Sequence, residues 1–208
     1  MGLFNIFDKK IKMDKVLICV GTKEYGDDIF KVPFIDDLVM YFVENHKEGF
    51  QVVTNECFEK TNISVDELIK IAKENTKNKI YGTYGGVPLR VNEEDQVVFP
   101  YDDDAIIQSG NYNFWTSLVL FDEFWDKNSE FCLEKNWNRY YIAMPYRTFL
   151  LIGNADNEKS KQEILNQLEE YKKEDKEELV GSGDFEAGRR IISNDLFIME
   201  NGKLTKVN

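Results

Sequence analysis

The stretch Lys31–Asn78, KVPFIDDLVMYFVENHKEGFQVVTNECFEKTNISVDELIKIAKENTKN, decides the fold. It predicts strand, turn, strand, short helix and long helix, in that order. Because Pro33 disfavours a helical conformation of the residue before it, Val32–Ile35 is expected to be extended. The apolar run Leu38–Val43 is typical of a strand buried on both faces, although periodicity alone leaves a helix open. A turn at Asn45–Gly49 then leads into a second short strand.

Two capping signals predict where the helices of this stretch begin. Thr54 is expected to cap a brief helix that runs to Thr61. Ser64 followed by Glu67 forms a capping box, in which each side chain satisfies a free backbone N–H of the first turn. Apolar residues then recur at helical spacing, which predicts a long helix with one buried face. These residues are Val65, Leu68, Ile69 and Ala72.

Short apolar segments bounded by turn residues predict further strands along the chain. They are Lys15–Val20, Lys79–Thr83, Val87–Val91, Gln96–Tyr101, Arg139–Met144, Thr148–Ile152, Leu196–Met199 and Leu204–Val207. The Gly85-Gly86 and Asn201-Gly202 pairs indicate hairpins. Phe114–Leu120 is either a strand or the opening of a helix, and Phe121, Phe124 and Trp125 continue at helical spacing.

A last long helix is predicted after Asp156, which is a good N-cap. Its apolar stripe consists of Ile164, Leu165, Leu168 and Tyr171. No repeat, low-complexity segment or clear linker divides the chain. We therefore expect an α+β fold, in which a single compact domain has a mixed, mostly antiparallel sheet packed with three to four helices.

Several segments, in order, resemble the YtpQ-like family of uncharacterised bacterial proteins, a domain-of-unknown-function family. They are Val32–Leu38, Val53–Glu56, Ile63–Asn75, Ser117–Leu120 with Phe124-Trp125, Met144–Leu151, Asn154–Asp156 and the Asn201-Gly202 hairpin. The resemblance covers residues 30–208 and implies an intracellular bacterial protein with no assigned reaction. Residues 1–29, an N-terminal segment plus the first strand, depart from the family pattern. So does the insertion-like Gly181–Arg190, and we expect one globular unit overall.

Composition limits the classes of partner. The 208 residues include 38 Asp and Glu against 26 Lys and Arg, a formal net charge of −12. Unaided nucleic-acid binding is not expected, because phosphate neutralisation needs clustered basic residues. A basic protein partner would be attracted. The separated Cys19, Cys57 and Cys132 form no CxxC pair, and a cytosolic location is the simplest interpretation. No apolar run approaches the length needed to span a bilayer.

Two groups of carboxylates are candidate sites. Asp102, Asp103 and Asp104 could bind a hard cation, although their spacing does not follow the EF-hand loop and a solvated acidic loop is the simpler interpretation. Asp36 and Asp37 could meet Arg147 in space, and such a pair would either lock the sheet or bind a ligand.

Catalytic motifs are not evident in the sequence. The single histidine, His46, lies next to a predicted turn and is expected to be solvated. A Cys57–His46 dyad is conceivable, but an inert thiol is the expectation. Gly181–Gly188 fits neither the P-loop nor the dinucleotide-binding pattern. No catalytic residue and no cofactor is therefore assigned.

Two classes of function remain in view. The first is a non-catalytic intracellular protein-binding protein, in one version an immunity or antitoxin-like protein that covers a basic effector. The second is a metal-dependent, carboxylate-based hydrolase using Asp36, Asp37 or the Asp102–Asp104 run. A structural or assembly role is a third alternative, and the oligomeric state stays open.

Overall fold

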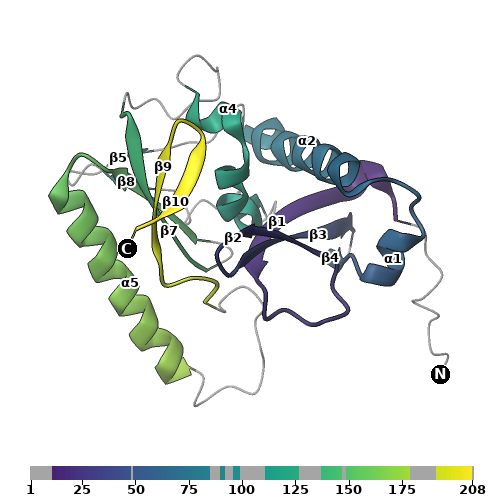
Figure 1. The fold of residues 1–208 in the computed structure, drawn as a ribbon, viewed down its shortest axis with the longest axis horizontal. Helices are drawn as coiled ribbons and strands as arrows, with labels where there is room; N and C mark the ends of the chain where they lie inside the picture. The colour runs from purple at the N-terminus through teal and green to yellow at the C-terminus, as the bar shows by residue number, and fades with distance from the viewer. Residues whose placement is uncertain are drawn as a thin grey trace.

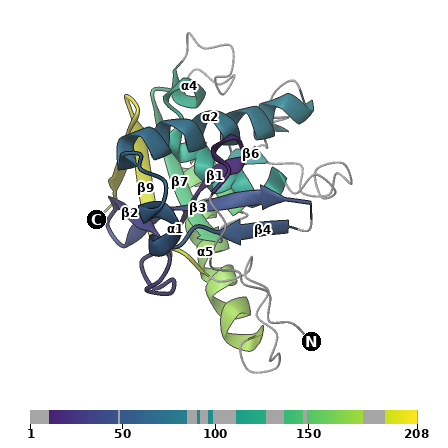
Figure 2. The same cartoon turned by 90° about the vertical axis from the view of Figure 1, so that its right-hand side faces the viewer.

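The computed structural model describes residues 11–47, 49–84, 90–91, 96–98, 111–126, 137–146, 149–178 and 191–207. Its fold is α+β, as the sequence predicts, and its strands form two antiparallel sheets rather than one. The long helices α2 and α5 lie on opposite sides of these sheets in both views (Figures 1 and 2).

Sheet 1 is organised around β3 (Leu38–His46). Strand β1 (Val16–Thr22) pairs with β3 from Leu38 to Glu44 along one side. On the other side, β2 (Lys31–Ile35) pairs with the first half of β3 and β4 (Gly49–Val52) with the second half. The predicted strands of the central stretch are therefore confirmed. Pro33 lies on β2, an outer strand of the sheet, where a residue without an N–H is tolerated.

Sheet 2 has six strands, all paired antiparallel. In spatial order they are β10 (Lys203–Lys206), β9 (Leu196–Glu200), β7 (Arg139–Tyr146), β8 (Phe149–Asn154), β6 (Gln96–Val98) and β5 (Arg90–Val91). The predicted hairpin at Asn201-Gly202 is confirmed. Both turn residues have positive φ, 49° and 72°, which Asn and Gly adopt at little cost.

The two helices of the central stretch begin where the capping signals predict. In α1 (Asn55–Glu59), the Thr54 hydroxyl accepts a hydrogen bond from the Cys57 N–H at 3.2 Å. Before α2 (Val65–Tyr84), the Ser64 hydroxyl accepts one from the Glu67 N–H at 3.2 Å. These side chains satisfy backbone donors that have no partner within their helix.

One predicted strand is wrong. Lys79–Thr83 belongs to the last turns of α2 and does not form a hairpin arm. Its β-branched and aromatic residues favour a strand locally. However, Ile80 falls eight residues after Ala72 and twelve after Leu68, and all three are buried in the same core. Because that stripe continues, tertiary packing extends the helix.

The second long helix, α5 (Glu158–Glu178), packs against β7 and β8. Its buried apolar side chains Ile164 and Leu168 confirm the predicted stripe. The cap differs from the prediction, because the Asn157 side chain accepts the hydrogen bond from the Lys159 N–H at 3.0 Å. Asp156 instead forms an ion pair with Arg139 at 2.5 Å.

On the outer side of β1, polar side chains rather than another strand make the hydrogen bonds to its backbone. The Ile18 N–H donates to the Thr76 hydroxyl at 2.8 Å, and the Ser117 hydroxyl donates to the Ile18 carbonyl at 2.9 Å. The Asn75 amide donates to the carbonyl of Val16 at 2.9 Å. All seven residues of β1 are buried, so these contacts supply partners that water cannot.

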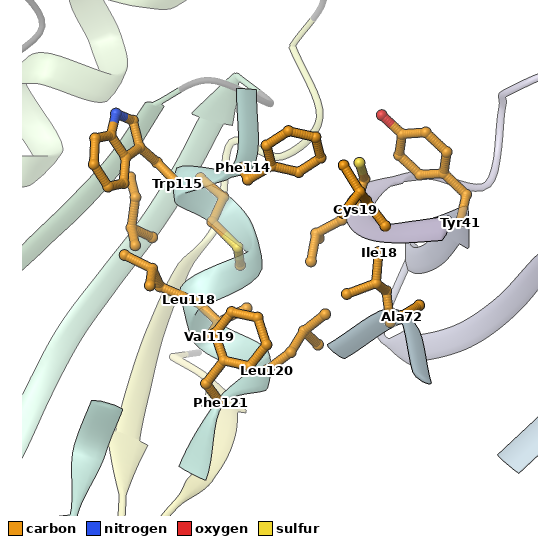
Figure 3. Packing of buried hydrophobic residues seen from close by; sticks show 14 of the residues in the cluster. Ile18, Cys19, Tyr41, Ala72, Phe114, Trp115, Leu118, Val119, Leu120 and Phe121 are labelled. Carbon is orange, nitrogen blue, oxygen red and sulfur yellow. The ribbon is translucent and has the colours of Figure 1, made fainter. Parts of the chain in front are cut away.

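The 3₁₀ helix η3 (Asn111–Leu120) lies between the two sheets. Figure 3 shows Trp115 and Leu118 on its side toward sheet 2, and Phe114 on its side toward Cys19 of β1. These side chains belong to one large core that includes residues of both sheets and of α2. The helical alternative for Phe114–Leu120 is therefore the one found, and Cys19 is buried as an apolar side chain.

A second, smaller core lies between α5 and the opposite face of sheet 2. It consists of Tyr141, Ala143, Leu151, Ala155, Ile164, Leu168 and Leu196. A Cβ on Gly153 of β8 would lie 2.1 Å from the Ser160 Oγ of α5. The absence of that carbon lets the helix approach the sheet closely.

Candidate functional site

The predicted site residues Asp36 and Asp37 form the two-residue turn between β2 and β3. Asp36 has a φ of 52°, in the left-handed region that aspartate tolerates better than most residues. The carboxylate of Asp37 forms an ion pair with Lys23. Asp36 forms one with Lys206 of β10, at 2.6 Å between Oδ2 and Nζ.

Lys206 also contacts Asp195, at 2.9 Å, and therefore joins the β2–β3 turn to the segment before β9. Hydrogen bonds from Lys206 to Asp36 and then to Asp195 raise the pKa of the lysine. Both turn carboxylates thus have basic partners, and Asp36 links sheet 1 to sheet 2. Arg147, the predicted partner, lies outside the described residues, so its pairing with Asp36 or Asp37 stays a prediction.

The predicted metal ligands Asp102, Asp103 and Asp104 also lie outside the described residues. Within the part of the chain that the structure describes, no group of three or more His, Cys, Asp or Glu side chains is arranged to hold a metal ion.

A hollow of about 690 Å³ lies where α4 (Asp122–Trp125) meets one end of sheet 2. Three separate segments form it, from α4, from the start of β7, and from the β9–β10 turn. Its lining contains three aromatic residues and three acidic residues, together with Asn138, Met199, Asn201 and Gly202. The aromatic residues are Trp125, Trp137 and Tyr140, and the acidic ones are Asp122, Asp126 and Glu200. We call this hollow the acidic groove.

The rings of the acidic groove hold one another in place. The ring centroids of Trp125 and Tyr140 are 5.2 Å apart, and those of Trp137 and Tyr140 are 5.8 Å apart. The indole N–H of Trp125 donates to the Leu118 carbonyl at 3.2 Å, which fixes that ring against η3. The groove therefore has a pre-formed aromatic wall, and ordering it costs a ligand little.

The electrostatic character of the acidic groove is negative. Asp122, Asp126 and Glu200 are all exposed, and no lysine or arginine is among the described lining residues. The nearby Arg139 is engaged by Asp156, whose hydrogen bond, with a smaller contribution from Glu200, raises the pKa of the guanidinium. Aromatic faces and carboxylates attract the same class of ligand, a cation. The arrangement can therefore bind an ammonium or guanidinium group.

A second hollow, of about 560 Å³, lies between η2 (Met13–Lys15), the end of β3 and α2. His46 lines it, and the prediction of a solvated histidine is wrong. Its side chain is 23% exposed, and its Nε2 is buried 3.5 Å from Oε1 of Glu44. Both residues lie on the same face of β3, two positions apart, so the strand holds them together.

Sequence reasoning missed the acidic groove and Glu44 for different reasons. Aromatic residues at helical spacing, such as Phe121, Phe124 and Trp125, more often pack in a core than line a site, and all three are indeed buried. The hollow beside Trp125 is completed by residues distant in sequence, so this stripe alone does not indicate that one of its edges lines a hollow. Glu44 directly follows the apolar run Leu38–Val43. A charged residue at that position of a buried strand is the one sequence signal that could have indicated a buried carboxylate.

Comparison of the chain with protein-family models, curated proteins and solved structures finds no match. None of the helices that the structure describes is both long and apolar enough to cross a membrane.

Proposed function

We propose that this protein is a non-catalytic binding protein, and that its acidic groove takes a basic side chain of a protein partner. The observation that carries this proposal is the combination of an aromatic wall with Asp122, Asp126 and Glu200 in one hollow. A lysine or arginine side chain matches both parts, because its charge interacts with the carboxylates and with the ring faces.

The charge of the whole chain supports the same partner. A net charge of −12 attracts a basic protein over a long range and raises the rate of association. It disfavours nucleic acid as a ligand. In one concrete version, this protein is a cytoplasmic immunity or antitoxin-like protein that covers the active face of a basic effector. Membership of the YtpQ-like family is part of the same proposal and is compatible with it, since that family has no assigned reaction.

The alternative of a metal-dependent hydrolase depends mainly on Asp102–Asp104. These residues lie outside the described part of the chain, so no observation favours that alternative. Asp36 and Asp37, its other ligands, are each engaged by a lysine.

Peptide titration of the full chain tests the proposal. The probe is a short neutral peptide with one central arginine, and the matched peptide carries uncharged citrulline instead. Two of the three tryptophans of the chain, Trp125 and Trp137, line the groove, so tryptophan fluorescence reports on binding there. We expect a saturable fluorescence change for the arginine peptide that weakens with salt, and none for the citrulline peptide.

A pair of charge-matched variants locates the binding site. The double variant Asp122→Asn/Asp126→Asn removes two charges from the groove, and we expect it to weaken binding about tenfold or more. The control Glu59→Gln/Glu170→Gln removes two exposed charges from α1 and α5 and should weaken binding only slightly. Equal losses in the two variants, or equal binding of the two peptides, would overturn the proposal. A pull-down from the source cell, repeated across salt concentrations, then seeks the natural partner.

A further inference from the structure

The turn of the β9–β10 hairpin carries a chemically reactive pair of residues. Asn201 and Gly202 form this two-residue turn, which lies beside α4 and lines the acidic groove (Figure 1). It is the only place in the 208 residues where a glycine follows an asparagine. In such a pair, the backbone nitrogen of the glycine can attack the side-chain amide of the asparagine, because the glycine has no Cβ to block the approach. The turn is therefore a candidate site of covalent modification.

The surroundings of the turn leave room for this reaction. Asn201 and Gly202 are both exposed to solvent. A Cβ added to Gly202 would have no heavy atom within 4 Å, so the space around this residue is open. Water and the rotated side chain of Asn201 can therefore reach the backbone here. The paired strands start at Glu200 and Lys203, so the two turn residues can rearrange while the strands stay paired.

Other asparagines of the described chain are held by hydrogen bonds. The amide of Asn75 donates to two backbone carbonyls, at 2.8 and 2.9 Å. Asn78 and Asn166 lie within helices, and each is hydrogen-bonded to a side chain one turn away. All three are followed by a residue that carries a side chain. Asn194 is exposed like Asn201, but an aspartate follows it. Exposure and the following glycine therefore coincide at Asn201.

We propose that Asn201 is a site of spontaneous deamidation, which converts an amide of the acidic groove into a carboxylate. The Gly202 nitrogen forms a bond to Cγ of Asn201, the bond from Cγ to Nδ2 breaks, and ammonia leaves with the proton of the glycine amide. Water then opens the resulting five-membered succinimide. Cleavage between Cγ and the nitrogen yields aspartate, and cleavage between the backbone carbonyl carbon and the nitrogen yields isoaspartate. The sum consumes one water and releases one ammonia, and nothing is oxidised or reduced.

The product changes the acidic groove in a defined way. Either form adds a fourth carboxylate to those of Asp122, Asp126 and Glu200. The aspartate form keeps the turn, because Asn201 has a φ of 49° and aspartate tolerates a positive φ as asparagine does. The isoaspartate form lengthens the backbone of the turn by one carbon and shifts the strands that it joins. We therefore expect the aspartate form to bind a cation more tightly. This consequence rests on the proposed function of the groove, whereas the deamidation itself does not.

Mass spectrometry of the full chain tests the modification. The native protein is incubated at mildly alkaline pH and digested at acidic pH, and the conversion of each asparagine is followed over time. A sample unfolded in guanidinium chloride measures the same chemistry without the fold. We expect Asn201 to convert first in the native protein. The variant Gly202→Asn, which tolerates positive φ, should slow this conversion about tenfold or more, because its side chain obstructs the attack.

Two outcomes of this experiment would overturn the proposal. In the first, Asn201 stays intact in the native protein over the time in which the unfolded sample converts. In the second, the exposed Asn194 converts before Asn201, which would mean that the turn gives the pair no advantage.

A charge-matched pair of variants tests the consequence for binding. Asn201→Asp and Asn194→Asp each add one carboxylate, and Asn194 does not line the groove. We expect Asn201→Asp to bind the arginine peptide about threefold more tightly, and Asn194→Asp to change the affinity less than about 1.5-fold. Equal gains would show that only the net charge acts, and would overturn the effect on the groove. If the arginine peptide does not bind the unmodified protein, the proposed function fails while the deamidation stands. If Asn201 stays intact, the deamidation fails while the proposed function stands.

Discussion

Helices α2 and α5 are nearly the same length, 20 and 21 residues, and each lays an apolar stripe on a sheet, yet they have different structural roles. Helix α2 buries Leu68, Ala72 and Ile80 in the large core that both sheets share. It also supplies the Asn75 and Thr76 side chains to the backbone of β1. The described side chains of α5 contribute to the small core only.

The difference lies in the polar residues within each stripe. Thr76 is fully buried on α2 and accepts the hydrogen bond of the Ile18 N–H. Ser160 is fully buried on α5, and its Oγ has no hydrogen-bond partner among the described residues. A buried hydroxyl that accepts a hydrogen bond from a strand's backbone stabilises the sheet. A buried hydroxyl without a partner contributes packing but no hydrogen bond. We therefore expect α2 to be integral to the fold and α5 to be the more easily released helix.

The largest expected effect comes from shortening one leucine on each helix. We expect Leu68→Ala to cost about 4 kcal/mol and Leu168→Ala about 3 kcal/mol of unfolding free energy. Both side chains are buried, but α5 packs mainly against β7 and β8, whereas α2 packs against β1, η2 and η3, so we expect the small core to close more readily over a cavity. Urea unfolding followed by circular dichroism measures both values. A larger loss for Leu168→Ala would reverse the assigned roles of the helices.

Hydrogen exchange tests the same comparison without mutation. Amides of α5 should exchange through local openings of lower free energy than those of α2, because α5 rests on fewer buried residues. Exchange of both helices only through global unfolding would show that the two cores open together.

Removal of one buried hydroxyl from each helix should change the free energy of unfolding less than the leucine variants do. The two hydroxyl variants should, however, differ more clearly from each other. Thr76→Val leaves the Ile18 N–H buried without an acceptor and should cost about 2 kcal/mol. Ser160→Ala removes a hydroxyl that has no partner among the described residues, and should leave stability unchanged or slightly increased. Thermal and urea unfolding of the two variants give the comparison. Similar losses for both would mean that β1 does not depend on α2 for its hydrogen bonds.

The smallest effect is expected at the exposed link between the sheets. Lys206→Met should lower the thermal midpoint slightly, because the contacts with Asp36 and Asp195 are lost, and Lys203→Met on the same strand is the control. The pKa of Lys206 is raised in the folded state, so its contribution is fully present below the unfolded value of 10.5 and is lost as pH rises through the folded value. The difference between wild type and Lys206→Met should therefore be constant near neutral pH and vanish under strongly alkaline conditions. A difference that grows with pH would contradict this ion pair.

Sequence reasoning finds the elements whose signals are local. The caps at Thr54 and Ser64, the strand Leu38–Val43 and the Asn201-Gly202 turn each depend on neighbouring residues, and each is confirmed. The continuation of α2 through Lys79–Thr83 was missed, because burial of Ile80 against distant residues decides it.

The candidate sites were less accessible to prediction because each is assembled from distant segments. The acidic groove brings together residues 122–126, 137–140 and 199–202, and the hollow that His46 lines brings together η2, β3 and α2. Net charge predicts the kind of partner but not where it binds. The pair of Asp36 with Lys206 likewise follows from the arrangement of the two sheets, and the pair of Asp37 with Lys23 follows from the pairing of β1 with β3.

The sealing of β1 has a consequence for self-association. An outer strand with unpaired backbone groups is a template on which another chain can add a strand, and such growth leads to aggregation. Here Asn75, Thr76 and Ser117 bond to backbone groups of Val16 and Ile18, and all seven residues of β1 are buried, so a foreign strand would have to displace these side chains to extend sheet 1 at β1. Three polar side chains thus protect a fully buried strand from strand addition by another chain.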